Sequence, residues 1–198
     1  MSSTAPPPGT TGLTYADLRK LPTPSEAGGD RYELLDGELL VSPSPATRHQ
    51  LAVLAIAATL RSHTNRQGGT TLIAPTDVWF SDETVLEPDV LALTAARVDR
   101  VRWDRVVGAP DLVVEVSSPS TRRTDVVRKQ RVYEREGVPE FWFVDLDADQ
   151  IQVYRLGPDR TYGPPEVTLA DGVVCSSSIE GMEIAAGEAL ALDAPGPH

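Results

Sequence analysis

The span from residue 110 to residue 144 constrains the fold more than any other part of the sequence. An apolar run at Leu112–Val116 predicts a buried strand, and Phe141–Val144 predicts a second one. Between them, a helix is predicted at Thr124–Glu136, with Gly137 as its cap. A strand, a helix and a strand in this order predict a right-handed crossover between two parallel strands. We therefore expect an α/β fold (mixed α+β) in which helices flank a mixed sheet.

A hairpin is predicted at Tyr32–Val41, because Asp36-Gly37 between two apolar runs suits a two-residue type I′ turn. This turn fixes a register in which Glu33 pairs with Leu40 and successive side chains alternate between two faces. One face then holds Glu33, Leu35, Glu38 and Leu40, and the other holds Tyr32, Leu34, Leu39 and Val41.

The other predicted elements are shorter or less regular. A helix at residues 46–65 is apolar all round in its middle, so the sheet and a partner subunit are both expected to cover it. A short helix with Thr14 as its cap is predicted at residues 13–18. Strands are predicted at residues 71–74, 78–80, 89–93 and 151–156, and short edge strands and loops at residues 167–169, 173–174 and 179–184.

Length and composition predict a single domain. The chain has 198 residues and is 40% hydrophobic, which suffices for one buried core and is too little for two ordinary domains. We expect a disordered Ser/Thr/Pro-rich tail at residues 1–12, a domain at residues 13–192 and a tail at residues 193–198. No apolar run is long enough for a signal sequence or a membrane span, and the single cysteine, Cys175, suits a reducing compartment. A cytoplasmic protein without membrane contact is therefore expected.

The charge of the chain disfavours tight nonspecific binding to a polyanion, since the formal net charge is −11. Two basic stretches weaken this objection. One holds Arg97, Arg100, Arg102 and Arg105, and the other holds Arg122, Arg123, Arg128, Lys129 and Arg131. Alternatively, both stretches are solvated surfaces held by salt bridges.

Two carboxylates lie in short β-type runs: Asp89 follows Glu87-Pro88, and Glu115 lies inside an apolar strand. A negative charge there is costly unless a cation or a hydrogen-bond donor meets it. Metal-dependent hydrolases carry their ligands in this way. Taken singly, each residue also fits a structural role, Asp89 in the turn after Pro88 and Glu115 as a salt-bridged strand carboxylate.

Four segments follow one another in a fixed order: RYELLDGELL at residues 31–40, SPSP at 42–45 with His49-Gln50, EPDV at 87–90 and PDLVVEVSSPSTRRTDVVRKQRVYEREGVPEFWFV at 110–144. Together they resemble the Uma-two family of endonucleases, within the PD-(D/E)xK superfamily. Each piece alone is weak, but the ordered set is specific and covers roughly residues 13–192. The resemblance implies a restriction-endonuclease-like mixed sheet flanked by helices.

The resemblance also implies roles for particular residues. Asp89 matches the acid of the family's Pro-Asp pair, and Glu115 matches the acid of its third motif. In such nucleases two carboxylates hold Mg²⁺ together with a backbone carbonyl, here that of Val116, and Mn²⁺ can substitute. Oxygen ligands with open positions suit Mg²⁺, which keeps several waters and can take a phosphate oxygen.

This chain departs from the superfamily pattern at one position. The pattern has a lysine two residues after the glutamate, whereas this chain has Ser117. Serine cannot supply a positive charge. Asp125, Lys129 and Tyr133 recur every four residues on one predicted helix face, and the family has a lysine at the position of Lys129. Lys129 is therefore expected to replace the missing lysine. A surface pair between Asp125 and Lys129 remains the alternative.

Two further residues are candidates for the site. Glu33, in the family's Tyr-Glu pair, is the preferred additional carboxylate, with an exposed hairpin carboxylate as the alternative. For His49 we favour a residue at the helix start that hydrogen-bonds to backbone over a catalytic role.

These observations leave three functions open. The first is a Mg²⁺-dependent endonuclease that hydrolyses phosphodiester bonds in DNA, with Asp89, Glu115, Lys129 and Glu33 as its catalytic residues and a homodimer as its expected assembly. The second is a catalytically weak or inactive interaction module, which Ser117 and the acidic charge favour. The third is a phosphodiesterase on a smaller nucleotide substrate.

Overall fold

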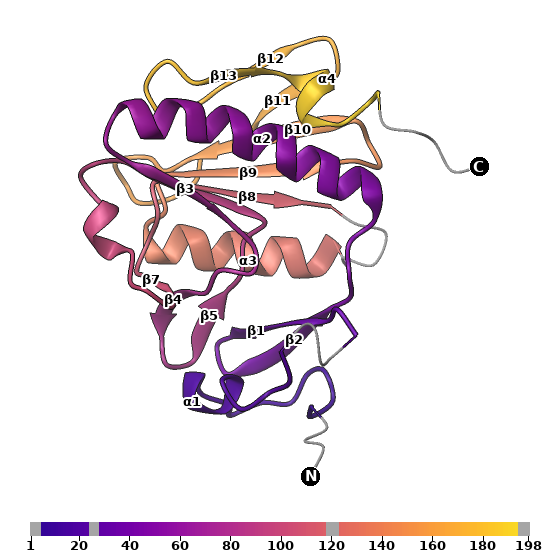
Figure 1. The fold of residues 1–198 in the computed structure, drawn as a ribbon, viewed down its shortest axis with the longest axis vertical. Coiled ribbons are helices and arrows are strands. Elements are labelled where there is room, and N and C mark those ends of the chain that lie inside the picture. The colour runs from indigo at the N-terminus through magenta and orange to yellow at the C-terminus, as the bar shows by residue number, and fades with distance from the viewer. Residues whose placement is uncertain (1–4, 24–27, 118–122, 194–198) are drawn as a thin grey trace.

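The computed structural model describes residues 5–23, 28–117 and 123–193 of the chain, and Figure 1 shows how its helices and strands are arranged. The helices are α1 (Tyr15–Leu18), α2 (Thr47–Arg66), η1 (Val98–Arg100), α3 (Arg123–Glu136) and α4 (Ala186–Ala189). The strands are β1 (Arg31–Leu35), β2 (Glu38–Ser42), β3 (Thr70–Ile73), β4 (Val78–Ser81), β5 (Thr84–Leu86), β6 (Val90–Leu93), β7 (Val106–Val107), β8 (Leu112–Val116), β9 (Glu140–Asp145), β10 (Gln150–Arg155), β11 (Glu166–Leu169), β12 (Val173–Cys175) and β13 (Glu183–Ala185).

Eleven of the thirteen strands in the described residues form two sheets, and β12 and β13 pair separately. The larger has six strands in the order β11-β10-β9-β8-β6-β3, and the smaller has five in the order β2-β1-β5-β4-β7. Strands β8 and β9 pair in parallel with α3 between them in sequence, which confirms the predicted crossover. Helix α2 covers one face of the six-stranded sheet and α3 lies against the other (Figure 1). The fold class predicted from the sequence is confirmed.

Strand β8 is buried on both faces, and its alternation decides where Glu115 points. Leu112, Val114 and Val116 belong to the core cluster that includes Ile56 of α2. Val113 belongs to a second cluster, with Tyr133 of α3 and residues of the smaller sheet. Glu115 therefore faces the space between β8, α3 and the five-stranded sheet.

The β1–β2 hairpin has the predicted register. Glu33 pairs with Leu40 and Leu35 pairs with Glu38. Asp36 and Gly37 have φ angles of 53° and 79°, the two positive values that a type I′ turn requires. Leu35 packs into the cluster beneath α3, whereas Leu34 packs on the opposite face beside α1. The hairpin therefore turns Glu33 toward α3.

The predicted N-terminal tail is wrong for its last residues, because part of it pairs with β2. The Gly9 N–H donates to the Leu39 carbonyl at 2.9 Å, and the Leu39 N–H donates to the Thr10 carbonyl at 2.8 Å. β2 is at the edge of its sheet, so its outer backbone groups need partners, and this segment supplies them. Residues 1–4 and 194–198 of the predicted tails lie outside the described residues.

The second cover of α2 comes in part from the chain itself. Ile184 of β13 and Ala186 and Ala189 of α4 share the core cluster of Ile56, a role that the sequence did not assign to this region. Leu54 on α2 is nevertheless 64% exposed. The homodimer therefore stays a prediction. No helix in the described part of the chain is long and apolar enough to cross a membrane.

Candidate active site

Asp89 and Glu115 come together because β6 and β8 are paired antiparallel. Val90 lies opposite Val114, so the same register continued by one residue sets Asp89 opposite Glu115. Residues directly opposite in such a pair carry their side chains on the same face. Both side chains are buried, and the N–H of Val116 donates to Asp89 Oδ2 at 2.9 Å. Two acids that are 26 positions apart in the sequence thus form one buried centre.

Donors surround the carboxylate of Asp89. Arg31 Nη1 lies 2.9 Å from Oδ1, and His49 Nε2 lies 3.2 Å from Oδ2. Burial alone would raise the pKa of Asp89, but the contacts with His49, Arg31 and the Val116 N–H together lower this pKa to about 2. Asp89 is therefore an ionised buried carboxylate.

Glu115 has fewer donors than Asp89. Lys129 Nζ lies 3.2 Å from each of its oxygens, and the Tyr133 hydroxyl donates to Oε1 at 2.6 Å. Burial raises the pKa of Glu115 to about 7, although the ammonium of Lys129 opposes the rise. Near neutral pH this side chain is thus poised between its acid and its carboxylate.

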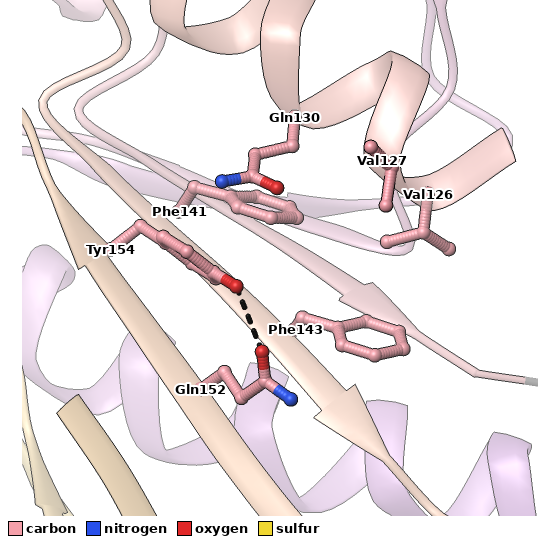
Figure 2. A pocket seen from close by; sticks show the side chains of 7 residues that line it. All are labelled: Val126, Val127, Gln130, Phe141, Phe143, Gln152 and Tyr154. Carbon is pink, nitrogen blue, oxygen red and sulfur yellow. Dashed lines mark hydrogen bonds between the residues drawn. The ribbon is translucent and has the colours of Figure 1, made fainter. Parts of the chain in front are cut away.

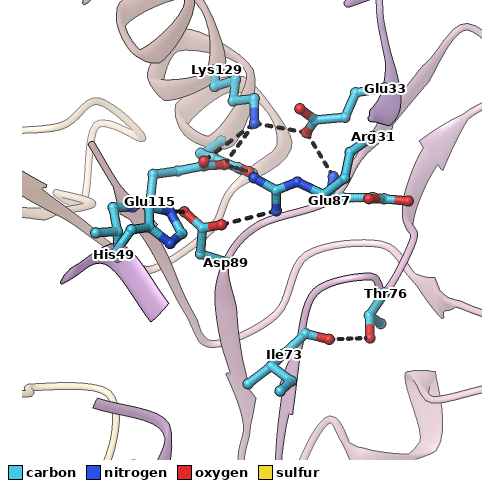
Figure 3. A network of polar contacts seen from close by, with 11 residues as sticks. Arg31, Glu33, His49, Ile73, Thr76, Glu87, Asp89, Glu115 and Lys129 are labelled. Atoms are coloured by element: carbon cyan, nitrogen blue, oxygen red, sulfur yellow. Dashed lines mark hydrogen bonds and ion pairs between the residues drawn. The ribbon is translucent and has the colours of Figure 1, made fainter. Parts of the chain in front are cut away.

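Lys129 connects Glu115 to the hairpin. Its Nζ lies 2.7 Å from Oε1 of Glu33, and the same Glu33 oxygen accepts the backbone N–H of Glu87 at 2.8 Å. Burial would lower the pKa of Lys129, but the nearby carboxylates raise it above its usual value, so the ammonium stays charged. Figure 3 shows Lys129 from α3 pointing toward Glu33 and Glu115.

Each element contributes to the site through its own periodicity. Arg31 and Glu33 are two residues apart on β1 and so share a face, and Lys129 and Tyr133 are one turn apart on α3. His49 comes from the first turn of α2. Strand pairing and helix packing therefore bring five separate segments to one point.

The structure decides several alternatives that the sequence left open. Lys129 is only 7% exposed, so the interpretation as a surface pair is wrong, while the side chain of Asp125 lies outside the described residues. Glu33 is 2% exposed and is not an exposed hairpin carboxylate. The favoured interpretation of His49 was also wrong, because its ring nitrogen contacts Asp89 rather than backbone. The contact joins the first turn of α2 to the residue that precedes β6.

Ser117 has a structural role. Its hydroxyl oxygen accepts the N–H of Leu146 at 2.8 Å, and its side chain is buried. Val116 contributes its N–H to Asp89, while the role of its carbonyl as a metal ligand stays a prediction. The basic stretches are mixed, since Arg97 pairs with Asp111 and Arg128 pairs with Glu38, whereas Lys129 is buried in the site.

Arg31 and Glu87 were not predicted from the sequence as residues of the site. The spacing Arg31-x-Glu33 within a strand was a usable signal, because it puts both side chains on the face that carries Glu33. Burial, together with the charges of Glu33 and Asp77, raises the pKa of Glu87 to about 8. Glu87 is therefore mostly protonated at neutral pH, and no pattern in the sequence indicated that.

The site retains unused polar capacity. Among the described residues, five buried side-chain polar atoms have no hydrogen-bond partner, and three of them belong here. They are Arg31 Nε, His49 Nδ1 and Glu87 Oε2. Native interiors leave few such atoms unpaired, so a concentration of them marks a place suited to a bound polar group.

The pocket in Figure 2 lies apart from these residues. It is a cavity of about 60 Å³ between α3, β9 and β10, lined by Val126, Val127, Gln130, Phe141, Phe143, Gln152 and Tyr154. Its polar groups are two amides and one hydroxyl, and the Tyr154 hydroxyl donates to the Gln152 side chain. With no ionisable carboxylate or amine in its lining, the pocket offers no group for acid, base or metal chemistry.

Comparison with known proteins identifies the class. The family model Uma2, described as "Putative restriction endonuclease", matches residues 15–187, and the chain belongs to this family. The crystal structure of a putative nuclease belonging to DUF820 from Anabaena variabilis ATCC 29413 has a similar fold, with a TM-score of 0.74, 19% sequence identity, and coverage of 90% of this chain and 98% of that chain. A search of curated proteins found no match. The family and the nuclease fold predicted from the sequence are confirmed.

Proposed function

We propose that this protein is a metal-dependent endonuclease that hydrolyses phosphodiester bonds in DNA, with Mg²⁺ as its ion and Mn²⁺ as a substitute. One observation carries the proposal. Two carboxylates on paired strands, Asp89 and Glu115, share a buried centre with an ammonium, since Lys129 Nζ lies 3.2 Å from both oxygens of Glu115. Two acids and a lysine are the groups that PD-(D/E)xK chemistry needs, although the lysine comes from α3 and not from β8.

The donor set fits one hard cation. With Glu115 ionised, Glu33, Asp89 and Glu115 bring three negative charges against the two permanent positive charges of Arg31 and Lys129, which leaves a deficit of positive charge. No cluster of three or more His, Cys, Asp or Glu side chains suited to a metal occurs among the described residues. Mg²⁺ does not require one, because it commonly takes one or two carboxylates and fills its shell with water and phosphate oxygens.

Asp89, Glu115 and the carbonyl of Val116 would hold the ion. When bound, Mg²⁺ lowers the pKa of a coordinated water and neutralises charge on the phosphate. The reaction is hydrolysis: a water oxygen bonds to phosphorus, the bond from phosphorus to one sugar oxygen breaks, and that oxygen takes a proton.

The protein's own groups would orient and stabilise the reacting atoms. The ammonium of Lys129 would donate to the phosphate oxygen on which negative charge develops. Glu33 fixes that ammonium at 2.7 Å, and Tyr133 fixes Glu115 at 2.6 Å. Arg31, His49 and the Val116 N–H hold Asp89 in one orientation.

A second candidate function is an impaired nuclease that serves as an interaction module. One observation favours it: both oxygens of Asp89 already have partners, Arg31 on Oδ1 and His49 with the Val116 N–H on Oδ2. A carboxylate that already accepts three donors binds a metal less strongly, and Ser117 supplies no compensating charge.

Cleavage of supercoiled and linear DNA in Mg²⁺, in Mn²⁺ and in EDTA tests the proposal, with Glu115→Gln as the matched inactive variant. Metal-dependent cleavage of DNA that Glu115→Gln lacks supports an endonuclease. Hydrolysis restricted to a panel of small nucleotide diesters indicates a phosphodiesterase. No hydrolysis of either substrate, in a folded protein that binds no Mn²⁺, supports the interaction module.

A further inference from the structure

A second charged cleft lies at the opposite end of β8 from Glu115. It has a volume of about 460 Å³ and is lined by Arg97, Arg100, Val107, Gly108, Ala109, Glu136, Gly137 and Arg160. Ala109 precedes β8, and Gly137 follows α3. The cleft is therefore formed where β8 begins and α3 ends, and it shares no residue with the candidate active site.

Two of its three arginines carry charge that no carboxylate offsets in the described part of the chain. Arg97 pairs with Asp111, and Glu136 pairs with Arg135, so these charges are offset. The side chain of Arg100 donates only to the carbonyl of Ala109 among the described residues. The side chain of Arg160 makes no hydrogen bond or ion pair with them, and only its backbone N–H donates, to the Gly157 carbonyl. In a chain with a net charge of −11, two uncompensated guanidinium groups in one cleft are selective for an anion.

The backbone around Arg160 is arranged to present its side chain. Arg160 itself has a φ of 62°, which is costly for a residue with a side chain. Gly137 has a φ of 77°, and a Cβ atom there would lie 3.0 Å from Arg160 Nη2. The guanidinium of Arg160 thus packs against the backbone of Gly137, whose positive φ ends α3. A favourable interaction of a cation with the C-terminal end of the α3 dipole would explain the position of Arg160, but it does not explain the position of Arg100.

Beside this cleft is the most exposed tryptophan of the described residues. Trp103 is 95% exposed at the tip of a tight turn, which the Val101–Val106 bridge and the hydrogen bond from the Arg102 N–H to the Arg105 carbonyl close. The turn lies between Arg100 and Val107, both of which line the cleft. An indole held in water gains much by stacking on a flat partner, and a nucleic-acid base offers a π-face at every position.

We propose that this cleft and Trp103 form a second nucleic-acid contact, in which the Arg100 and Arg160 guanidinium groups hold a backbone phosphate and Trp103 stacks on an unpaired base. The contact rests on the proposed function, because it places the same strand that enters the active site. Gly137 lies eight residues beyond Lys129 on α3, about 12 Å along a helix. Ala109 lies six residues before Glu115, about 20 Å along a strand. At about 3.4 Å per nucleotide, the rise of a strand that keeps its duplex stacking, the contact falls roughly four to six nucleotides from the scissile phosphate.

Binding without cleavage tests this contact directly. The full chain is titrated in EDTA with fluorescently labelled oligothymidylates of 4 and 12 nucleotides, and anisotropy is recorded at several salt concentrations. The Arg100→Ala/Arg160→Ala variant should bind the 12-mer at least tenfold more weakly and with a shallower salt dependence, because phosphate contacts release counterions. Trp103→Ala should weaken binding by about 5- to 100-fold, the scale of one lost base stack. Trp103→Phe should recover part of it.

Arg61→Ala is the control for the single variant Arg160→Ala, since Arg61 is exposed on α2, away from the cleft, and each change removes one positive charge. It should change affinity less than twofold. The wild-type chain should also prefer the 12-mer over the 4-mer more strongly than the double-arginine variant does. Arg160→Ala alone, which alters only an exposed side chain, serves if the double variant is unstable.

Four results would overturn the contact. The first is an unchanged DNA affinity in both Trp103→Ala and the arginine variant, and the second is an equal loss of DNA affinity in Arg61→Ala. The third is full competition by inorganic phosphate at concentrations that match the oligonucleotide. The fourth is a change in the sedimenting mass of Trp103→Ala while its DNA affinity stays intact. The last would mean that the tryptophan contacts a protein. These measurements use no metal, so they separate the two proposals. If DNA binding depends on these residues but the chain does not cleave DNA, only the proposed hydrolysis is excluded. If the chain cleaves DNA but the variants bind it as wild type does, only the second contact is excluded.

Discussion

Two buried carboxylates on neighbouring strands, Glu115 on β8 and Glu140 on β9, show how differently one sheet can treat a negative charge. Glu140 is fully buried and accepts hydrogen bonds from the indole of Trp142, the hydroxyl of Ser176, the backbone and hydroxyl of Ser177 and the backbone of Ser178. Each of these donors is neutral. Glu115 instead receives one ammonium and one phenol, at distances of 2.6 to 3.2 Å.

The difference separates a structural carboxylate from a reactive one. Five neutral donors satisfy the carboxylate of Glu140, four of them on Oε2 and the Trp142 indole on Oε1, and fasten the turn before β13 to the sheet. Glu115 shares its ammonium with Glu33, and three unpaired polar atoms lie around the same centre. A buried carboxylate that has few donors and shares its cation can still bind a further partner. Glu115 is therefore favoured over Glu140 as the reactive carboxylate.

Neutralising each of the two carboxylates in turn tests the difference between them most directly. Glu115→Gln should reduce the cleavage rate by at least about 10³-fold, since it removes a ligand on which the proposed metal depends. Its fold should stay intact or become slightly more stable, because a buried charge is lost. Single-turnover cleavage and urea denaturation of the same preparation measure both effects.

Glu140→Gln is the matched control for that measurement. It should cleave at the wild-type rate per folded molecule, because Glu140 lies among neutral donors at the start of β9. If Glu115→Gln cleaved DNA as fast as wild type, Glu115 would be structural and the contrast with Glu140 would disappear.

The next largest effect is expected at Lys129. Lys129→Ala should lower the cleavage rate by about 10²–10³-fold at saturating Mg²⁺, the scale of one preorganised donor, with little loss of metal affinity. Lys129→Arg should recover only part of the rate, because a planar guanidinium does not reproduce a compact ammonium.

Ser117→Lys in the Lys129→Ala background sharpens this result, since residue 117 shares the face of β8 that carries Glu115. Partial rescue would show that the positive charge can come from either element. An unaltered rate in Lys129→Ala would exclude Lys129 from the reaction and favour the impaired nuclease.

Local rules predicted some of these features from the sequence. The Asp36-Gly37 turn sets the hairpin register by its own geometry, so the face carrying Glu33 was predicted correctly. The period of β8 placed Glu115 on the face of Val113, and the four-residue spacing on α3 grouped Lys129 with Tyr133. Each of these depends on contacts within one element or one turn.

The features that the sequence did not predict depend on how separate elements pack. Arg31 reaches Asp89 across 58 positions and His49 reaches it across 40, and each contact exists only once the two sheets and α2 are assembled. The Glu140 centre likewise joins β9 to Ser176, Ser177 and Ser178. A short polar run in a loop carries no signal for a buried acceptor far away in sequence.

A smaller effect is expected on stability when the Glu140 centre is cut. Glu140→Ala leaves the indole N–H of Trp142 and the backbone N–H of Ser177 without their acceptor, which should cost roughly 3 kcal/mol of unfolding free energy. Ser177→Ala removes only one hydroxyl donor and should cost about 1 kcal/mol. Urea denaturation ranks the two variants. Equal stability of Glu140→Ala and wild type would mean that this region contributes nothing to global stability.

The smallest expected effect is the pH dependence of stability, which reads out the Glu115 environment without any substrate. Burial raises the pKa of Glu115 from its usual 4.5 to about 7 in the folded chain. Folding therefore favours the protonated form, so the stabilisation is complete below about pH 4.5 and is lost as the pH rises through about 7.

In EDTA, wild type should lose on the order of 2 kcal/mol of unfolding free energy relative to Glu115→Gln between pH 5 and pH 8. Glu87, whose pKa is raised to about 8, should add a loss of the same sign that Glu87→Gln removes. Adding Mg²⁺ at pH 8 should restore stability to wild type but not to Glu115→Gln, because only the ionised carboxylate gains from a bound cation. Parallel pH profiles for wild type and Glu115→Gln would show that the Glu115 charge is as well accommodated as that of Glu140, and the contrast between the two strands would fail.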